Sequence, residues 1–243
     1  MAILAPSDLG MLASLFALSR LGYTVMMLSP RLAADACVSL LDGVGCSTIL
    51  HGQTVHIQTT MQGIQSIKKS IIGHPVPSEA VISAVNVDSV LVTATAEQNA
   101  ENIALIMHSS GSTGTPKPLL LSHRALMTIP LHGSGLSIFG PLPWFHMYGI
   151  GQTFQAFWMR KTFFAWHAMT PVTGQGLVRA LEAAQPESVC TVPYILQLIA
   201  EADGGIEALR RCKSIVYGGA ACPDELGDKL VNYGVRVVAE LGS

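Results

Sequence analysis

The feature that most constrains this chain is a regular alternation of β-type and helix-type segments, which starts at its first residues. Asp8 or Ser7 can cap the first helix, and Gly22 can close it. Three strands joined by two helices predict parallel pairing with right-handed crossovers, so the expected fold class is α/β. The strand and helix segments alternate, in chain order, at residues 2–5, 7–22, 23–28, 33–41 and 46–50.

The second half of the chain repeats this alternation. Residues 103–108 are predicted as a strand because five apolar residues run into a loop of small residues. Residues 51–100 are less regular, and we expect a helix near 62–71 with a loop after it. Further strands are expected at 119–121, 161–166, 188–192, 214–217 and 235–240, and further helices at 123–131, 149–158, 173–184, 194–202 and 223–233.

Glycine and proline cluster around residues 130–143, and this cluster is the best candidate for an internal boundary. The predicted organisation is therefore two βα subdomains with mostly parallel sheets, at residues 1–135 and 136–243.

Composition narrows the classes of partner. Only 12% of the 243 residues are charged and 49% are hydrophobic, whereas an ordinary soluble domain has about 25% charged residues. Either the chain is nearly all core, or part of its surface is covered by something else. The net charge of −2 comes without a basic stripe, which argues against nucleic acid as a partner. Small-molecule chemistry remains the open class.

Cysteine usage and hydropathy point to the cytoplasm and not to a membrane. The five cysteines are odd in number and include no Cys-x-x-Cys spacing, which favours reduced thiols over disulfides and gives no zinc-type cluster. No metal ligands are proposed. Residues 9–18 are apolar but too short to span a bilayer. Residues 125–159 lack charge, but prolines and histidines interrupt them, so a buried interior is expected there.

The most informative segment follows the strand at 103–108. Its glycines allow a tight turn, its hydroxyls and free N–H groups can surround phosphate oxygens, and its lysine adds a positive charge. A plain flexible loop is the alternative reading of the same composition. The candidate phosphate loop consists of Ser109, Ser110, Gly111, Ser112, Thr113, Gly114, Thr115, Pro116 and Lys117.

Other phosphate and nucleophile motifs fail on individual residues. A Walker loop needs Gly before the Lys and Ser or Thr after it, but Pro116 and Pro118 occupy those places. This difference disfavours an ordinary P-loop kinase or ATPase. Only two of the three glycines of a dinucleotide fingerprint are present. Ser110 stands where a nucleophile elbow needs its first glycine.

The loop at 109–117 resembles the signature loop of the AMP-binding, adenylate-forming superfamily, which includes acyl-CoA synthetases, luciferases and peptide-synthetase adenylation domains. The resemblance covers essentially the whole chain. Residues 18–32 are similar to fungal synthetase-like proteins, including carboxylic acid reductases. Two further segments match, namely Pro143-Trp144-Phe145-His146-Met147-Tyr148-Gly149 and Tyr217-Gly218-Gly219-Ala220-Ala221.

The resemblance implies a reaction and roles for these residues. The family joins a carboxylic acid to the α-phosphate of ATP, giving acyl-AMP and pyrophosphate, with ATP and Mg²⁺ required. Lys117 and the loop would hold the departing phosphates, and His146 would lie near the acyl-adenylate oxygens. The acid pocket would be lined by Phe145, His146, Tyr148 and Gly149, and the adenine would lie along Gly218, Gly219, Ala220 and Ala221. Core packing is the alternative for the aromatic residues, and a strand-to-helix turn for the glycines.

The end of the chain departs from the family pattern. The pattern continues beyond Ser243 with a Thr-Glu pair, whose Glu holds Mg²⁺, and then with a ribose-binding Asp and a catalytic Lys. We therefore expect a partial adenylation domain that lacks the C-terminal subdomain and is truncated at both ends. In fungal relatives the activated acid would pass to a carrier protein. A non-catalytic remnant that binds nucleotide weakly, or acts with a partner, is the alternative.

Overall fold

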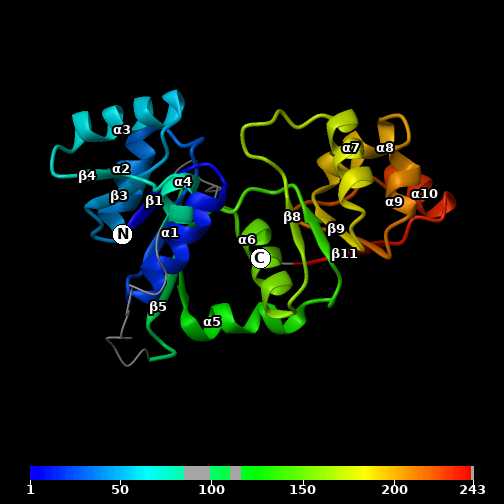
Figure 1. The fold of residues 1–243 in the computed structure, drawn as a ribbon, viewed down its shortest axis with the longest axis horizontal. Helices are drawn as coiled ribbons and strands as arrows, with labels where there is room; N and C mark the ends of the chain where they lie inside the picture. The colour runs from blue at the N-terminus through cyan, green and yellow to red at the C-terminus, as the bar shows by residue number, and fades with distance from the viewer. Residues whose placement is uncertain (85–98, 110–115, 242–243) are drawn as a thin grey trace. The chain divides into compact units, whose positions relative to one another are not determined.

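The computed structural model describes residues 1–84, 99–109 and 116–241. The chain divides into two compact units, Met1–Met127 and Thr128–Ser243. Figure 1 traces the alternation of helices and strands in each unit. The subdomain boundary expected between residues 135 and 136 stays a prediction.

The first unit alternates strands and helices along its length. The Asp8 side chain accepts a hydrogen bond from the backbone N–H of Met11 at 2.9 Å, which satisfies one free donor at the start of the first helix. Its elements are β1 (Ala2–Leu4), α1 (Leu9–Arg20), β2 (Val25–Leu28), α2 (Ala34–Gly43), β3 (Thr48–His51), α3 (Val55–Ile67), β4 (Ile72–Pro75), α4 (Glu79–Ala84), β5 (Ile103–His108), β6 (Pro118–Ser122) and α5 (His123–Thr128).

A six-stranded sheet organises the first unit, in the order β4-β3-β1-β2-β5-β6. Neighbouring strands are parallel except for β5 and β6, which form an antiparallel pair. Alternate side chains of β1 and β2 pack against α2 and α3, which lie side by side in Figure 1. α1 contacts the same two strands, and its buried residues include Met11 and Leu15. A sheet covered by helices on both faces matches the expected α/β class.

The second unit repeats the pattern. The Thr173 hydroxyl caps one helix by accepting from the Gly176 N–H at 3.1 Å. Its elements are η2 (Pro130–His132), β7 (Ile138–Gly140), α6 (Met147–Trp158), β8 (Phe163–Ala165), α7 (Gly174–Ala184), β9 (Ser188–Thr191), α8 (Pro193–Glu201), α9 (Gly205–Arg210), β10 (Ser214–Tyr217), α10 (Asp224–Asn232) and β11 (Val237–Ala239).

All strands of the second sheet are parallel, in the order β11-β10-β9-β7-β8. Phe139, Val189 and Ile215 face a core that α7, α8, α9 and α10 supply. Ile138 and Cys190 face the other way, against Ala156 of α6. Figure 1 shows α7 to α10 gathered together and α6 separate from them. β8 lies on one side of β7, and the chain then crosses to the other side of β7 to form β9, β10 and β11. The topological switch point therefore lies between β7 and β9.

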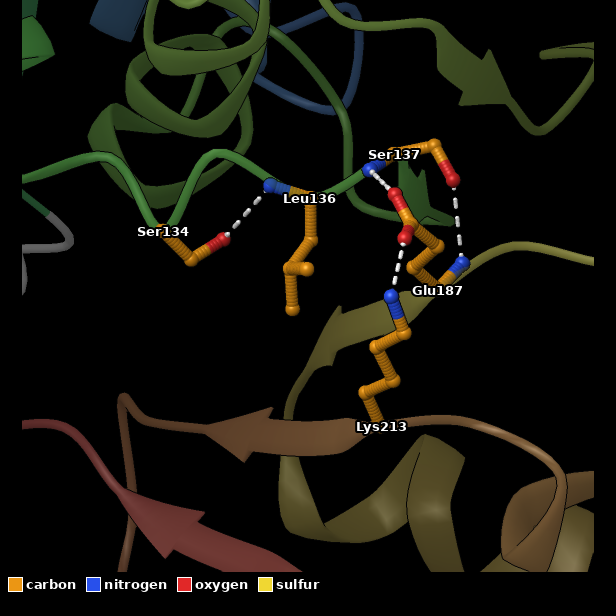
Figure 2. A network of polar contacts seen from close by, with 5 residues as sticks. All are labelled: Ser134, Leu136, Ser137, Glu187 and Lys213. Carbon is orange, nitrogen blue, oxygen red and sulfur yellow. Dashed lines mark hydrogen bonds and ion pairs between the residues drawn. The ribbon is translucent and has the colours of Figure 1, made fainter.

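A polar network ties together the amino-terminal ends of three of these strands (Figure 2). The Glu187 carboxylate accepts from the Ser137 N–H at 2.9 Å and from Lys213 Nζ at 2.6 Å, and the Glu187 N–H donates to the Ser137 hydroxyl at 3.0 Å. These residues directly precede β7, β9 and β10. The Lys213 hydrogen bond, followed by that of Ser137, lowers the pKa of Glu187 to about 2. The amino-terminal edge is thus held by structural contacts, and the carboxyl-terminal edge is the one available to a ligand.

Four elements were not anticipated from the sequence, namely β4, α4, β7 and α9. The helix expected at 62–71 was misplaced, because α3 begins at Val55, where the Thr54 hydroxyl accepts from the Ile57 N–H. The sequence predicts a loop at β4, because this segment contains Gly73 and ends at Pro75. Its backbone pairs with β3 at the edge of the sheet, a position that tolerates proline.

Candidate active site

The two ends of the candidate phosphate loop meet at the base of a hairpin. β5 and β6 pair with His108 opposite Pro118. The Ser109 N–H donates to the Lys117 carbonyl at 3.0 Å, and the Lys117 N–H donates to the Ser109 hydroxyl at 3.4 Å. Lys117 is exposed. The middle of the loop, from residue 110 to residue 115, lies outside the described residues, so its predicted phosphate contacts stay predictions.

His108 lies directly before this loop and is a residue whose role the sequence did not reveal. Its Nε2 accepts a hydrogen bond from the Ser29 N–H at 3.1 Å, which joins the carboxyl ends of β2 and β5. Burial lowers the pKa of His108, although a backbone interaction with Ser109 opposes the shift. The ring is neutral when Nε2 accepts, so Nδ1 carries the proton. That Nδ1 is buried and has no hydrogen-bond partner in the described part of the chain.

The aromatic-His segment follows β7 and therefore lies at the switch point of the second sheet. Open α/β sheets bind ligands at this place. Phe145 is buried, with 5% of its surface exposed, and its ring is tilted against that of His146 with centroids 4.8 Å apart. His146 is exposed and occupies the N-cap position of α6. Of the predicted pocket residues, His146 and the half-buried Tyr148 are accessible, while Phe145 and Gly149 are packed inside.

Gly149 is required by a close backbone approach in this segment. A Cβ atom at this position would lie 2.3 Å from the Pro143 carbonyl oxygen and 2.9 Å from that of Leu142. The chain before α6 therefore folds back onto the first turn of the helix. This fold positions His146 and Tyr148 at its start.

The glycine segment follows β10, two strands away from β7. The Gly218 N–H donates to the Thr191 carbonyl at 3.1 Å, and a Cβ at Gly218 would lie 2.9 Å from the Glu240 carbonyl oxygen. Gly219 has a φ of +80° and is exposed. Ala220 and Ala221 are exposed as well, and α10 begins soon after them. The result is a bare backbone surface at the carboxyl edge.

Tyr148 links these two segments. A Cβ at Gly218 would lie 3.5 Å from Cζ of the Tyr148 ring, an ordinary contact distance, so the ring packs beside the glycine. One helical turn further on, Gln152 Nε2 donates to Glu240 Oε2 at 3.3 Å. The structure therefore brings the start of α6 together with the ends of β10 and β11. The sequence indicated Tyr148 and Gly218, but nothing in it gave a role to Gln152 or Glu240.

Two further findings concern metals and membranes. Across residues 1–84, 99–109 and 116–241, no group of three His, Cys, Asp or Glu side chains could hold a metal ion. Within the same described ranges, no helix combines the length and the apolar character that a membrane crossing requires. The five cysteines are free thiols.

Comparison with known proteins identifies the family. The family model described as AMP-binding enzyme matches residues 1–242. The chain belongs to the AMP-binding enzyme family. The reaction of this family is the adenylation of carboxylic acids, in which ATP is consumed.

The relatives of this AMP-binding chain are much longer than the chain itself. It is 27% identical over 262 residues to the adenylate-forming reductase stbB of Stachybotrys bisbyi, covering 100% of this chain and 24% of that protein. It is also 27% identical over 258 residues to the non-canonical non-ribosomal peptide synthetase ascB of Acremonium egyptiacum, with coverages of 100% and 23%. The chain thus spans about a quarter of the length of these fungal relatives.

A solved structure confirms the fold. The N-terminal domain of FACL13 from Mycobacterium tuberculosis superimposes with a TM-score of 0.83 at 17% identity, covering 100% of this chain and 62% of that one. The α/β class with two mostly parallel sheets, expected from the sequence, is therefore the N-terminal fold of adenylate-forming enzymes.

Proposed function

We propose that this chain supplies the nucleotide site and part of the acid site of an adenylation domain, which activates a carboxylic acid as acyl-AMP. The observation that supports the proposal is the packing of the Tyr148 ring beside Gly218 at the carboxyl edge of the second sheet, with His146 two positions before Tyr148 in the chain. Two of these residues follow the switch-point strand β7. A ligand at this edge meets the positive end of α6 and a bare glycine backbone.

The residues present fit an adenylate in chemical terms. The exposed backbone from Gly219 to Ala221, which follows the buried Gly218, offers a surface with little side chain, on which a planar base can lie. His146 is exposed at the N-terminus of α6, where an oxygen anion is favoured. Lys117 is exposed at the base of the candidate phosphate loop and can pair with phosphate oxygens.

Catalysis in such a site is mainly positioning and charge stabilisation. The acid carboxylate attacks the α-phosphorus of ATP, the bond from this phosphorus to the bridging oxygen breaks, and pyrophosphate leaves with that electron pair. Charge crowding at phosphorus is the main barrier. Lys117 would offset charge on the departing pyrophosphate. His146 would stabilise the acyl-phosphate oxygens through its ring N–H.

Mg²⁺ would neutralise phosphate charge in this reaction. The described residues offer no cluster of side chains for such an ion. No residue of this chain is therefore assigned to it, and no step of the proposal depends on it.

The proposed setting is fungal secondary metabolism, and its support is the pair of fungal relatives named above. There the acyl group would pass to the thiol of a carrier protein. Acid-dependent exchange of labelled pyrophosphate into ATP tests the proposal, and binding of an acyl-AMP is measured in parallel. Exchange supports the full proposal, binding without exchange identifies a chain that holds the nucleotide without catalysis, and absence of both refutes it.

A further inference from the structure

The amino-terminal edge of the second sheet carries a row of cations. β10 and β11 start directly after Lys213 and Arg236, and Arg160 and Lys161 lie just before β8. Arg211, two positions before Lys213, follows the last residue of α9. The strands pair in register near their starts, so these residues line one edge of the sheet. Together the five cations are called the basic edge, and they come from three separate stretches of the sequence, so no local run reveals them.

One carboxylate lies within the basic edge and is already paired. Glu187, which directly precedes β9, accepts a hydrogen bond from Lys213 Nζ at 2.6 Å (Figure 2). This contact is the largest cause of the lowered pKa of Glu187, and the charge of Lys161 adds to it, so both cations lie near this carboxylate. Hydrogen bonds between Glu187 and Ser137 hold the same strand starts together. The edge is therefore preorganised, which reduces the entropy lost when a partner binds.

The remaining charge of the basic edge is not neutralised within the chain. Four of its cations are exposed and form no ion pair in residues 1–84, 99–109 and 116–241, namely Arg160, Lys161, Arg211 and Arg236. The opposite edge has the other sign, because Glu240 follows β11 and the acidic residues Asp224 and Glu225 open α10. Charge is thus separated along the strands of this unit, and the basic edge attracts an anionic partner.

Exposed aromatic side chains border the basic edge at the end of α6. Trp158 is 51% exposed and Phe157 is 45% exposed. The Lys161 N–H donates to the Ala156 carbonyl at 2.8 Å, which holds this end of the helix against the start of β8. Leu131 of η2, which contacts α6, is a further exposed apolar side chain. Tryptophan and arginine side chains contribute most to many protein–protein affinities, so their combination here is typical of a protein interface.

We propose that the basic edge and Trp158 form a docking surface for an acidic segment of a partner protein. Carboxylates of this segment pair with the cations at the strand starts, and its apolar side chains pack on Trp158. The surface lies at the edge opposite to Tyr148 and Gly218, so it leaves the candidate active site free. The inference therefore goes beyond the proposed function.

The distribution of carboxylates favours a protein over a polyphosphate chain or a lipid surface. Glu187 interrupts the row of cations. Glu182 and Glu201 lie in the last turns of α7 and α8, which return the chain towards the same edge. A continuous array of phosphates would meet these carboxylates as well as the cations, whereas a protein segment can place its own carboxylates only where cations stand. Complementarity of this kind gives specificity for one partner.

A peptide array of random sequences tests the chemistry of the partner. The labelled full chain is applied to the array, and the bound peptides are sorted by their content of acidic and apolar residues. We expect enrichment of Asp and Glu in combination with Leu, Ile, Phe or Trp. The affinity of the best peptide should fall about tenfold when the salt concentration is raised from about 0.05 to 0.5 M. Single-stranded RNA and vesicles that contain phosphatidylserine should each bind more weakly than this peptide.

Neutral variants locate the binding on the basic edge. Lys161→Gln and Arg236→Gln should each weaken binding of the best peptide about two- to fivefold, and Trp158→Gln about tenfold. All three side chains are exposed, so neither the melting temperature nor the binding of an acyl-adenylate should change. The matched controls, which replace exposed side chains elsewhere on this unit and should leave peptide binding unchanged, are Arg179→Gln, Lys229→Gln and Tyr194→Gln.

Each outcome bears on a defined claim. Binding that requires acidic peptides and weakens in the three edge variants supports the docking surface. The absence of any bound peptide, bound peptides without acidic enrichment, tighter binding of RNA or vesicles, or binding that survives the variants overturns it. Failure of the parent chain to bind an acyl-adenylate overturns only the proposed function, so the two claims fail separately.

Discussion

Gly149 gives the sharpest test of how the site is held. Replacing it by alanine places a Cβ atom 2.3 Å from the Pro143 carbonyl oxygen, far inside contact distance. To relieve this contact, the first turn of α6 and the backbone at Pro143 would have to move apart. Overpacking of this kind costs about 1–3 kcal/mol, while alanine recovers up to about 1 kcal/mol of helix propensity. Because a backbone oxygen at 2.3 Å is a severe clash, the cost lies near the upper end of that range, and the net expectation is a loss of about 2 kcal/mol.

A matched substitution provides the control. Gly227 lies within α10, and a Cβ there would meet nothing within 4 Å. Gly227→Ala should therefore stabilise the chain by up to about 1 kcal/mol. Urea denaturation followed by circular dichroism compares the two variants with the parent. A Gly149→Ala variant as stable as the parent, or shifted in the same direction as Gly227→Ala, would refute the close approach of the Pro143 carbonyl.

Three other predictions follow from single residues. Lys117→Ala should weaken ATP binding about ten- to a hundredfold in calorimetry while changing stability by less than about 0.5 kcal/mol. The control variant Lys229→Ala, on α10, should change neither the affinity nor the stability. An unchanged affinity of the Lys117→Ala variant would show that Lys117 does not contact ATP. Thr191→Val should stabilise the second unit by about 1 kcal/mol, because the Thr191 hydroxyl is buried without a partner among the described residues; a lower melting temperature would contradict this. The free energy of unfolding should fall as the pH drops below about 6.5, because His108 binds a proton more readily in the unfolded chain. It should fall again between about pH 4.5 and pH 2, because Glu187 is protonated in the unfolded chain before it is protonated in the folded one. In pH-dependent denaturation, His108→Gln and Glu187→Gln should each flatten one of these two slopes.

Local signals in the sequence were enough to find most of the fold. Asp8 is one of the two caps predicted for α1, and Thr173 is the first residue of the helix predicted at 173–184; both side chains accept the backbone hydrogen bonds that define a cap. The alternation of apolar runs gave the parallel α/β class. β7 and β4 were missed because they are short and contain glycine. Their strand form comes from pairing with neighbouring strands, which local sequence does not encode.

The candidate site was only partly visible in the sequence for a similar reason. His146 and the glycines at 218 and 219 stand in recognisable strings. The Gln152–Glu240 contact and the Ser29–His108 contact span 88 and 79 positions, respectively. Such pairs form only when parallel strands bring their carboxyl ends to one edge, so no spacing in the sequence could have revealed them.

Calorimetric titration with a non-hydrolysable acyl-adenylate tests the central claim most directly, because this ligand occupies the nucleotide and acid sites together. We expect saturable binding at one site per chain, competition by ATP, and a higher melting temperature of the complex. A chain that is folded by circular dichroism but gives no heat of binding, or whose binding ATP does not reduce, would contradict it.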